Sequence, residues 1–355
     1  MMNDLVGHTG YDGTRMGTRR LYNRVLFARG YLRGDPVVRH YPITLEIEAT
    51  NRCYEDCFMC PRRYMQRPVG DLTLETLHKC LEPFHGQVEL VNLFHAGEPL
   101  MHDTLPDLVR GCHEHGAAVL ITSTGALLSG ETSRRLIESG LDMIVFSLDA
   151  ATDETYRQVR KHSRYDRVVA NIRQLLDLKK QLGRGPFVQV QMVAMDVNRH
   201  ETRRFVSQWR GVADSVRVKH LYNTANIAPR IGEPVPQPPL GRPRPCIMLW
   251  CEPVVCWDGT VLPCCVDLIG QAPIGNVHDR SLLEIWNGPE LVEMRRKHAA
   301  GRYDEVDLCR RCKIFQVKWP FVVARTLFHE LTVRKLSPLV ERLETVHRLR
   351  RFSYF

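Results

Sequence analysis

The sequence predicts an α/β protein in which about six strands, each followed by a helix, form a parallel sheet that rolls into a barrel or an open part-barrel. Short apolar segments of strand length alternate with longer segments of helical periodicity over residues 41–225. Polar residues follow the apolar segments, where the chain would leave the carboxyl end of each strand. Because connections between parallel strands are right-handed, such a series closes toward a barrel with helices outside.

The elements of this region follow one another in a regular order. Alternating apolar and polar residues predict the first strand over 43–49, and Thr73 is expected to cap the helix that comes next. Further strands are expected over 88–97, 118–125, 143–150 and 187–195 and at "SVRVKHLYN", and the longest intervening helix over 166–183. Ligand chemistry in such folds lies at the carboxyl ends of the strands. The notable residues at those ends are Cys53, Gly97, Glu98, Thr122, Thr124, Ser147, Asp149 and Asn198.

A proline-rich segment over 226–245 separates this region from the rest of the chain. It holds seven prolines, which predicts a stiff, extended linker. After it, "VVCWDGTVLPCC" is expected to form a hairpin with Asp-Gly at its turn, and "SLLEIWNGPELVEMRRKH" a helix interrupted at its Gly-Pro pair. Residues 246–317 therefore read as a small hairpin-and-helix domain, and residues 318–355 as a basic helical segment.

The net charge of +9 arises at the two ends of the chain. Residues 1–40, a basic N-terminal extension, hold seven Arg against three Asp, and residues 318–355 hold eight Lys or Arg against three Glu. Residues 41–317 are neutral overall, whereas a nucleic-acid enzyme more often carries its positive charge around the cleft. We therefore expect no nucleic-acid partner. The basic ends are expected to be solvated surface, with docking of an anionic partner as the alternative.

Nothing in the sequence indicates a membrane span or a secretion signal. No apolar run approaches the roughly 20 residues that a span needs, and the N-terminus lacks the charged-then-apolar order of a signal peptide. A cytoplasmic location is therefore expected. The C-terminal helix is expected to pack on its own barrel, and a position on a membrane surface is the alternative.

Twelve cysteines are many for a chain expected to be reduced, and their clustering indicates metal rather than disulfides. Cys53, Cys57 and Cys60 share one loop after the first strand, with no local His or Cys as a fourth ligand. A structural zinc ion needs four ligands, and a [4Fe–4S] cluster normally uses four cysteines. Three cysteines would leave one iron open to a ligand from outside; zinc or unrelated thiols are the alternatives. Cys80 and Cys112 lie on helical patterns and are expected to be buried.

This Cys-x3-Cys-x2-Cys loop resembles the signature of the radical S-adenosylmethionine (SAM) enzymes. The resemblance implies a partial (β/α)6 TIM-like barrel and a [4Fe–4S] cluster on the three cysteines, with SAM's amino and carboxylate groups at the open iron. It also implies that one electron from the cluster cleaves SAM to methionine and a 5′-deoxyadenosyl radical, which removes a hydrogen atom from the substrate. A reductant such as flavodoxin or ferredoxin would supply the electron.

Two further segments are similar to SAM-binding motifs of that family. "HAGEPL" holds Gly97, Glu98 and Pro99, similar to the Gly-Glu-Pro segment whose backbone and Glu hold the SAM ammonium. "ITSTGALL" resembles the third-strand segment usually written Thr-Asn-Gly, with Ser123 and Thr124 in place of a residue that is often Asn.

The resemblance places four more residues near SAM. It implies that Ser147 lies near the ribose or the carboxylate, that Arg160 binds the carboxylate, and that Met192, in "VQMVAM", contributes to apolar contact with adenine. Met59 stands where the family usually has an aromatic residue packed on adenine, just before the third cysteine. A methionine can fill the same space because its side chain is flexible and polarizable.

A second group of thiols follows the linker: Cys246, Cys264, Cys309 and Cys312. Four thiols that end in Cys-x2-Cys suit either zinc or a complete [4Fe–4S] cluster, and spacing alone does not decide. The segment "CWDGTVLPCCVDLIGQAPIGNVHDRSLLEIWNG" resembles the SPASM domain that follows many radical SAM barrels. Only two cysteines follow residue 265, so the resemblance implies the shortened, twitch-like form with one fully ligated auxiliary [4Fe–4S] cluster. Zinc or a two-cluster site are the alternatives.

Three thiols in this region are left without a ligand role: Cys251, Cys256 and Cys265. A free thiol beside the active site would be able to return a hydrogen atom to a substrate radical, so each is a candidate hydrogen donor. Packing of small buried thiols is the alternative, because buried cysteines are ordinary.

Two classes of substrate are compatible with this layout. The one-cluster plan is similar to the radical SAM dehydrogenase of aminocyclitol antibiotic biosynthesis and to sugar epimerases, which implies a sugar-like small molecule that loses a carbinol hydrogen. Hydrogen return from a thiol gives an epimer. Loss of an electron to the auxiliary cluster, and of a proton to a base such as His95, His102 or Lys219, gives a ketone. The spare thiols favour epimerization.

The second class is a peptide-modifying maturase. Many of these carry an N-terminal leader-binding domain of roughly 80 residues, whereas only about 40 residues precede the first strand here. A stand-alone leader-binding partner would then be needed. An iron–sulfur scaffold or electron carrier is disfavoured, because an open SAM-type cluster has no purpose there.

Overall fold

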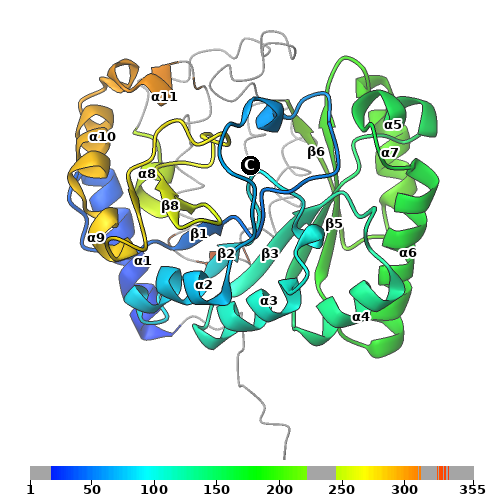
Figure 1. Ribbon diagram of the computed structural model, residues 1–355, viewed down its shortest axis with the longest axis horizontal. Coiled ribbons are helices and arrows are strands. Elements are labelled where there is room, and N and C mark those ends of the chain that lie inside the picture. Colours follow the sequence, from blue (N-terminus) through cyan, green and yellow to red (C-terminus); the bar gives the residue numbers. More distant parts are fainter. Residues whose placement is uncertain are drawn as a thin grey trace, which may run out of the picture.

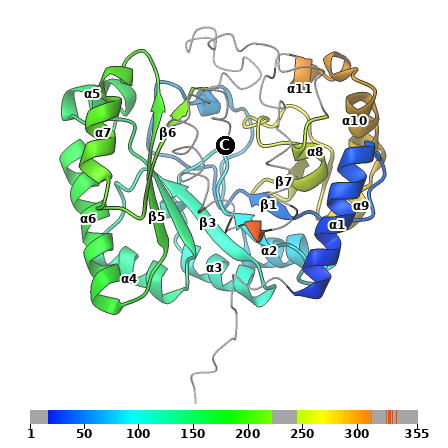
Figure 2. The same cartoon turned by 180° about the vertical axis from the view of Figure 1, so that it is seen from behind.

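The computed structural model describes residues 17–221 and 245–310, together with residues 312, 326, 328–330, 332 and 335. Within this part of the chain nine strands form one sheet, in the order β6-β5-β4-β3-β2-β1-β7-β8-β9. The sheet curves into a part-barrel, and the helices form an outer layer from α1, α9 and α10 at one end to α5, α6 and α7 at the other (Figures 1 and 2). The predicted fold class, a partial α/β barrel, is confirmed.

Six parallel strands make the barrel wall. They are β1 (Thr44–Ile47), β2 (Leu90–Asn92), β3 (Ala118–Ser123), β4 (Met143–Ser147), β5 (Phe187–Ala194) and β6 (Ser215–His220), each paired with the next. Several are shorter than their apolar patterns predict. Residues 93–97, for example, were expected in β2 but leave the ladder, and the Glu98 amide then donates to the Arg52 carbonyl at 2.8 Å. The carboxyl end of β2 is thereby tied to the loop that follows β1.

Helices cover the outer side of the sheet. In the described ranges they are α1 (Thr18–Arg33), α2 (Leu74–Leu81), α3 (Leu105–Glu114), α4 (Gly130–Glu138), α5 (Asp153–Val159), α6 (Tyr165–Leu182), α7 (Thr202–Trp209), α8 (Met248–Cys251), α9 (Leu282–Trp286), α10 (Pro289–Ala299) and α11 (Asp307–Arg310). Short 3₁₀ turns add η1 (Pro61–Tyr64), η2 (Glu82–Phe84), η3 (Pro99–Met101), η4 (Arg199–Glu201) and η7 (Tyr303–Glu305). The predicted cap is confirmed, because the Thr73 hydroxyl accepts from the Thr76 amide at 3.1 Å.

Alternation along the strands divides the side chains between two faces. On β4, Ile144 and Phe146 belong to the large core between the sheet and the helices, whereas Met143 and Val145 belong to a small apolar cluster on the inner face. Toward the carboxyl ends the inner face becomes polar. The polar side chains there include Glu46, Asn92, Ser147 and Gln191, and Gln189 and Ser215 lie on the same face further from the carboxyl ends. The inside of the barrel is therefore suited to hydrogen-bonding groups.

The predicted hairpin is confirmed and continues the barrel sheet. β7 (Val254–Val255) pairs in parallel with β1, opposite Glu46 and Ile47, and in antiparallel fashion with β8 (Thr260–Leu262). β9 (Gly275–Asn276) extends the sheet further. Gly259 occupies the turn with a φ of 82°, a conformation that favours glycine. The second domain predicted over 246–317 is thus joined to the barrel edge to edge.

The N-terminal extension differs from the expectation. Residues 1–40 were expected to be solvated surface, yet α1 packs against the outer core through Phe27 and Tyr31, which are buried. Tyr31 also donates to the Pro245 carbonyl at 2.9 Å. The reason lies in the sequence "LYNRVLFARGYL", whose helical period places Arg24, Phe27 and Tyr31 on one buried face and leaves Tyr22 and Arg29 exposed.

Other predictions are settled in part. Cys80 and Cys112 are fully buried on α2 and α3, as predicted. The interrupted helix is confirmed as α9 and α10 on either side of Gly288. The proline-rich segment lies almost wholly outside the described residues, as does most of the C-terminal segment over 318–355. Among the described helices, none combines the length and the apolar composition of a membrane span.

One ion pair is fully buried where α1 meets the start of β2. The guanidinium of Arg24 binds both carboxylate oxygens of Glu89, and neither side chain is exposed to solvent. The Glu330 amide also donates to Glu89 at 3.3 Å. This pair fixes α1 on the amino-terminal side of the barrel.

Replacing Arg24 by Met should lower the free energy of unfolding by about 3–5 kcal/mol, because it leaves the Glu89 carboxylate buried without its guanidinium. Anaerobic urea denaturation measures the effect. Arg33→Met, at an exposed arginine of the same helix, is the matched control and should change stability little. The double variant R24M/E89L should recover most of the loss, since it removes both charges. Equal stability of the Arg24 and Arg33 variants would contradict the assignment.

Candidate functional site

The three cysteines of the first group lie together in the loop between β1 and α2. The Cys60 amide donates to the Cys57 carbonyl at 3.1 Å, and η1 begins directly afterwards. Burial raises the pKa of Cys53 to about 11 and that of Cys57 to about 12, and the neighbouring thiols add to both shifts. The loop thus concentrates three thiols that would need a cation beside them to become thiolates.

The thiol spacing suits a cluster better than a single metal ion. Among the described residues, no three thiols of either cysteine group lie within 4.8 Å of one another. A tetrahedral zinc ion would hold its ligand sulfurs roughly 4 Å apart. A [4Fe–4S] cube holds its cysteines around a larger body, so the lack of such a tight thiol triplet among the described residues is compatible with a cluster at either group.

Arg160 reaches the first cysteine group from the end of α5. Its Nη1 donates to the Cys57 sulfur at 2.8 Å, and its Nη2 donates to the Ser147 carbonyl at 2.9 Å and pairs with Asp149. Burial alone would lower the pKa of Arg160, but the Cys57 and Asp149 charges raise it well above the usual range. A permanently charged guanidinium therefore stands beside the thiols, where the resemblance places an arginine for the SAM carboxylate.

Glu98 is held in a nest of donors at the carboxyl ends of β2 and β3. Its carboxylate accepts from the Thr124 amide at 2.9 Å, from the Thr124 hydroxyl at 3.0 Å and from the Leu100 amide at 3.2 Å. Burial raises the pKa of Glu98, and a hydrogen bond from Ser123 opposes that rise. Tyr54, from the cysteine loop, bonds to Thr124 as well. The structure thus brings together Gly97, Glu98, Pro99, Ser123 and Thr124, as the motifs predicted.

The adenine contacts are the part of the prediction that changes. Ser147 lies on the inner face at the end of β4 and accepts a hydrogen bond from the Gln191 amide group at 2.9 Å. Met192 is the next residue along β5, is fully buried, and belongs to the helix-side core. This placement contradicts the expected contact of Met192 with adenine, because a strand alternates its faces and Met192 has the outer one. Met59 is half-buried in the cysteine loop, and its expected adenine contact stays a prediction.

The second cysteine group also comes together. Cys246 precedes α8, Cys264 follows β8, Cys309 lies on α11, and Cys312 comes soon after it. After burial, the thiols of Cys312 and Cys309 contribute to the high pKa of Cys246, and Cys246 and Cys312 likewise affect Cys264. The four predicted positions are therefore neighbours in space although 67 residues of sequence span them.

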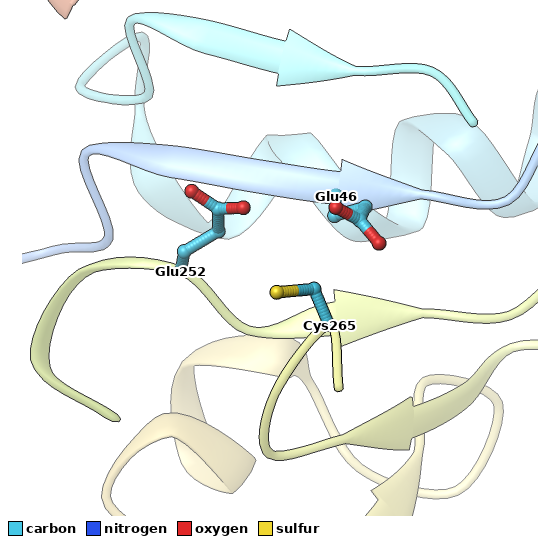
Figure 3. A group of neighbouring side chains, drawn as sticks. All are labelled: Glu46, Glu252 and Cys265. Atoms are coloured by element: carbon cyan, nitrogen blue, oxygen red, sulfur yellow. The ribbon is translucent and has the colours of Figure 1, made fainter. Parts of the chain in front are cut away.

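The three spare thiols differ in their surroundings. Cys251 is fully buried in the helix-side core on α8, and Cys256 is fully buried beside Val254 and Leu262. Cys265 is half-buried and lies on the inner side of the barrel, within 4.8 Å of carboxylate oxygens of Glu46 and Glu252 (Figure 3). Of the three candidate hydrogen donors, Cys265 is the one that is not fully buried in the described structure; Cys256 also lies near polar groups, Glu48 and Arg67, but is fully buried.

Sequence reasoning missed the two glutamates beside Cys265. Glu46 projects inward from β1, and His95 Nδ1 lies 2.6 Å from its carboxylate. Glu252 precedes β7, and the Asn92 side-chain amide donates to it at 3.3 Å. The signal for Glu46 was present: "ITLEIEA" alternates acidic with apolar residues, which in a strand buried on both faces indicates an interior carboxylate. No sequence pattern indicates the position of Glu252. That position results from the pairing of β7 with β1, which joins segments far apart in the sequence.

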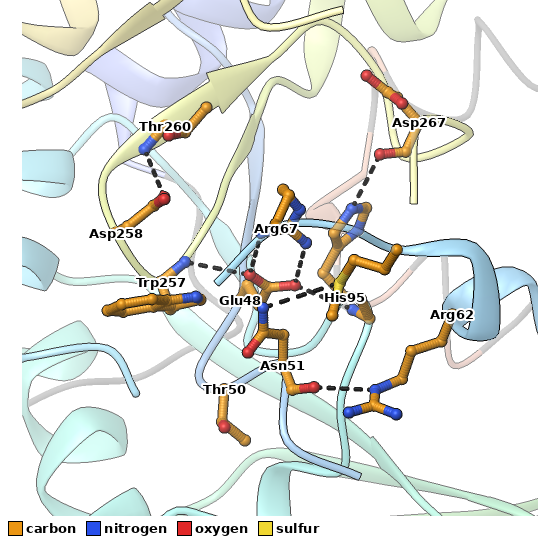
Figure 4. A network of polar contacts seen from close by, with 12 residues as sticks. Glu48, Thr50, Asn51, Arg62, Arg67, His95, Trp257, Asp258, Thr260 and Asp267 are labelled. Carbon is orange, nitrogen blue, oxygen red and sulfur yellow. Dashed lines mark hydrogen bonds and ion pairs between the residues drawn. The ribbon is translucent and has the colours of Figure 1, made fainter. Parts of the chain in front are cut away.

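The three candidate bases, His95, His102 and Lys219, lie in different surroundings. Burial disfavours a charged imidazole, but the hydrogen bond and charge of Glu46 raise the pKa of His95 above its usual value. His95 Nε2 lies 3.4 Å from the Asp267 carbonyl, so the ring is held from both sides (Figure 4). His102 is occupied elsewhere, with Nε2 2.9 Å from the Leu72 carbonyl. Lys219 lies on β6, across the barrel.

A polar network joins the cysteine loop to the hairpin. Glu48, fully buried, receives two hydrogen bonds from the Arg67 guanidinium, at 2.8 and 2.9 Å. Backbone amides add two more, from Trp257 at 3.2 Å and from Ala96 at 3.4 Å (Figure 4). One carboxylate therefore links β1, the segment after β2, the hairpin and the segment after the cysteine loop.

Replacing Gly97 by Ala should disrupt the cysteine loop. A Cβ at this position would collide with the Thr50 carbonyl and lie 2.8 Å from the Arg52 carbonyl, both backbone groups of the loop. We expect a loss of about 1–3 kcal/mol in stability and a lower iron content after reconstitution. Gly17→Ala is the control, because nothing lies within 4 Å of a Cβ there. A G97A variant that reconstitutes like the parent would contradict the close approach.

Two family models match the chain. The Radical SAM superfamily model matches residues 47–207, and the SPASM model, an iron–sulfur cluster-binding domain, matches residues 246–313. Together they match well over half of the chain.

Curated proteins and solved structures agree with these matches. The tungsten-containing aldehyde ferredoxin oxidoreductase cofactor-modifying protein of Pyrococcus furiosus is 24% identical over 293 residues, covering 71% of this chain and 82% of that protein. A probable GTP 3′,8-cyclase of Methanothermobacter thermautotrophicus is 32% identical over 171 residues, which are 47% of this chain and only 52% of that protein.

Among solved structures, the crystal structure of BtrN in complex with AdoMet and 2-DOIA matches with a TM-score of 0.53 at 20% identity. The match covers 78% of this chain and 96% of BtrN, and it supports the fold. With the cysteine loop at the carboxyl end of β1 and a second cysteine group beyond the hairpin, the chain belongs to the radical SAM superfamily, with a SAM-binding [4Fe–4S] cluster and an auxiliary iron–sulfur cluster in a SPASM domain.

Proposed function

We propose that this radical SAM enzyme epimerizes a carbinol carbon of a sugar-like or aminocyclitol-type small molecule, with Cys265 as the hydrogen donor. The observation that carries the proposal is the place of Cys265, which is only half-buried and lies inside the barrel beside Glu46 and Glu252, whereas Cys251 and Cys256 are fully buried. A hydrogen donor must reach the substrate, and Cys265 is the candidate whose side chain is not fully buried.

The interior supports a hydroxyl-rich substrate. In the described part of the barrel, buried side-chain oxygens without a hydrogen-bond partner occur on the inner positions of several strands: Thr44, Asn92, Gln189, Gln191 and Ser215. An unpartnered buried oxygen is costly, so these atoms indicate that a ligand with hydroxyl or amine donors belongs among them.

The chain's own residues would hold both cofactors. We assign Cys53, Cys57 and Cys60 to the SAM cluster, and Cys246, Cys264, Cys309 and Cys312 to the auxiliary cluster. Gly97, Glu98 and Pro99 would bind the SAM ammonium, with Ser123 and Thr124 fixing Glu98. Arg160 would bind the SAM carboxylate, and Ser147 would lie near it. When bound, the cluster and SAM supply a 5′-deoxyadenosyl radical, which takes one hydrogen atom from the substrate.

Cys265 completes the reaction. Its S–H bond breaks and a new C–H bond forms on the other face of the substrate carbon, which leaves a thiyl radical on Cys265. One electron from a flavodoxin- or ferredoxin-type reductant and one proton from solvent restore the thiol. The substrate undergoes no net oxidation, and one SAM is consumed per turnover.

Dehydrogenation of the same carbon is the second candidate. The pair of Glu46 and His95 favours it, because the Glu46 carboxylate can take up a substrate proton. A ketone would form and the electron would pass to the auxiliary cluster.

The ligand assignment predicts how iron content changes. The parent enzyme should bind about eight irons, and Cys57→Ala or Cys264→Ala should each lose about four, because each variant loses one cluster. Iron analysis and electron paramagnetic resonance after anaerobic reconstitution measure this. Cys80→Ala and Cys112→Ala, buried on helices, are the matched controls. Tightly bound zinc at the second group would contradict the auxiliary-cluster assignment.

Turnover in D2O tests the reaction. With dithionite, SAM and a panel of aminocyclitols and oligosaccharide intermediates, we expect one substrate to stimulate 5′-deoxyadenosine and to yield a product one mass unit heavier. Cys265→Ala should still form 5′-deoxyadenosine but not the deuterated epimer. Cys251→Ala and Cys256→Ala should retain epimerization.

Other outcomes of this turnover experiment are equally clear. A product two mass units lighter, formed also by the Cys265 variant, would establish the dehydrogenase instead. Stimulation by peptides and by no sugar would move the chain to the maturase class.

A further inference from the structure

Three acceptor groups converge on the inner face of β1 and β2. Glu46 and Asn92 are direct partners across the β1–β2 ladder, and Glu252 approaches from the segment that precedes β7. We call Glu46, Glu252 and Asn92 the inner acceptor cluster. All three side chains are at least 95% buried. Figure 3 shows both carboxylates and the Cys265 thiol facing the same space between β1 and the hairpin.

Hydrogen bonds within the protein fix the orientation of the cluster. His95 Nδ1 lies 2.6 Å from Glu46, and its other ring nitrogen lies near the Asp267 carbonyl. The Asn92 amide nitrogen donates to Glu252 at 3.3 Å. Because the amide nitrogen of Asn92 is used in this bond, the amide oxygen of the same side chain remains as an acceptor near Glu252. The two carboxylates are therefore held close together although their charges repel.

The Asn92 oxygen is an independent sign of a ligand. Asn92 is 1% exposed, and its Oδ1 has no hydrogen-bond partner in the described structure. Thr44, two residues before Glu46 on the same face of β1, also has an unpartnered hydroxyl and is fully buried. Two buried acceptors thus lack donors beside two carboxylates. The missing partner must be rich in N–H or O–H groups and positive or neutral in charge.

We propose that the inner acceptor cluster binds a protonated amine of the substrate, so that the substrate is an amino sugar or aminocyclitol and not a neutral or phosphorylated sugar. An ammonium group has three donors and no acceptor, which matches one oxygen each from Glu46, Glu252 and Asn92. This inference rests on the proposed function, because it concerns the substrate of the same barrel.

The proposal also explains the place of Cys265. Its sulfur lies within 4.8 Å of carboxylate oxygens that would hold the amine. A carbon that bears the amine, or its neighbour in the ring, would then stand next to the thiol. The cluster would position the reacting carbon against the hydrogen donor. A phosphate or carboxylate at this end of the substrate would instead be repelled by both glutamates.

Binding of matched compounds tests the proposal without turnover. The SAM-loaded holoenzyme would be titrated with scyllo-inosamine and scyllo-inositol, and with glucosamine and glucose, which differ only in one amine. We expect at least one amine to bind about tenfold or more tightly than its hydroxyl partner, because an ion pair to a buried carboxylate is stronger than a neutral hydrogen bond.

Conservative variants localise the effect. Glu252→Gln keeps the shape of the side chain and should abolish most of the amine preference, and Glu46→Gln should act in the same direction. Glu138→Gln, at an exposed glutamate on α4, is the matched control and should leave the preference unchanged. Iron content and thermal midpoint show whether each variant is folded and loaded.

Several results would overturn the amine subsite. They are equal binding within both pairs, a preference that survives in both Gln variants, and no amine binding up to about 10 mM. Stoichiometric zinc or another divalent ion beyond the cluster iron, lost in Glu252→Gln, would assign the cluster to a metal instead.

The subsite and the proposed reaction can fail separately. Amine-selective binding together with an oxidised product would contradict the proposed epimerization but support the amine subsite. Epimerization of a neutral sugar would keep the reaction and remove the subsite.

Discussion

The pairing of β1 with β7 is the constraint on which the site depends. β1 carries Glu46 on its inner face and is followed by Glu48 and the cysteine loop, while β7 begins the hairpin of the SPASM domain. Because the two strands share a ladder, the second cysteine group and Cys265 are held against the barrel at a fixed register. Without this pairing, Glu252 and Cys265 would have no defined place relative to Glu46.

The buried carboxylate of Glu48 strengthens the same junction. It receives hydrogen bonds from Arg67 and from backbone amides on both sides of the junction, so its charge is fully compensated by protein donors. Glu46, two residues earlier, has His95 as its partner and faces the interior. Adjacent inward positions on one strand thus differ in purpose. The Glu48 carboxylate binds only protein donors and joins neighbouring segments. The Glu46 carboxylate points to the inner side of the sheet.

Much of the fold was predictable from the sequence, because the period of apolar residues reports burial directly. The six βα units, the hairpin and both cysteine groups follow from local patterns and spacing. The position of Met192 could not be predicted in this way. A strand that is buried on both faces has apolar residues on both faces, so the pattern does not tell which face points into the barrel. The packing of α1 does not follow from its charge, because the buried Arg24 lies on the same face as Phe27 and Tyr31. The inner acceptor cluster depends on contacts between residues more than 150 positions apart, which no local pattern reports.

The polar interior also has a thermodynamic consequence for the free enzyme. Side-chain oxygens of Thr44, Gln189, Gln191 and Ser215 are withdrawn from water without receiving donors from the described protein. Each one lowers the stability of the barrel in its ligand-free form. A molecule that satisfies them binds the folded state alone, and it therefore raises the melting temperature by an amount that grows with the logarithm of its concentration relative to its Kd. A rise in the melting temperature can therefore identify a ligand of the barrel without any radical chemistry.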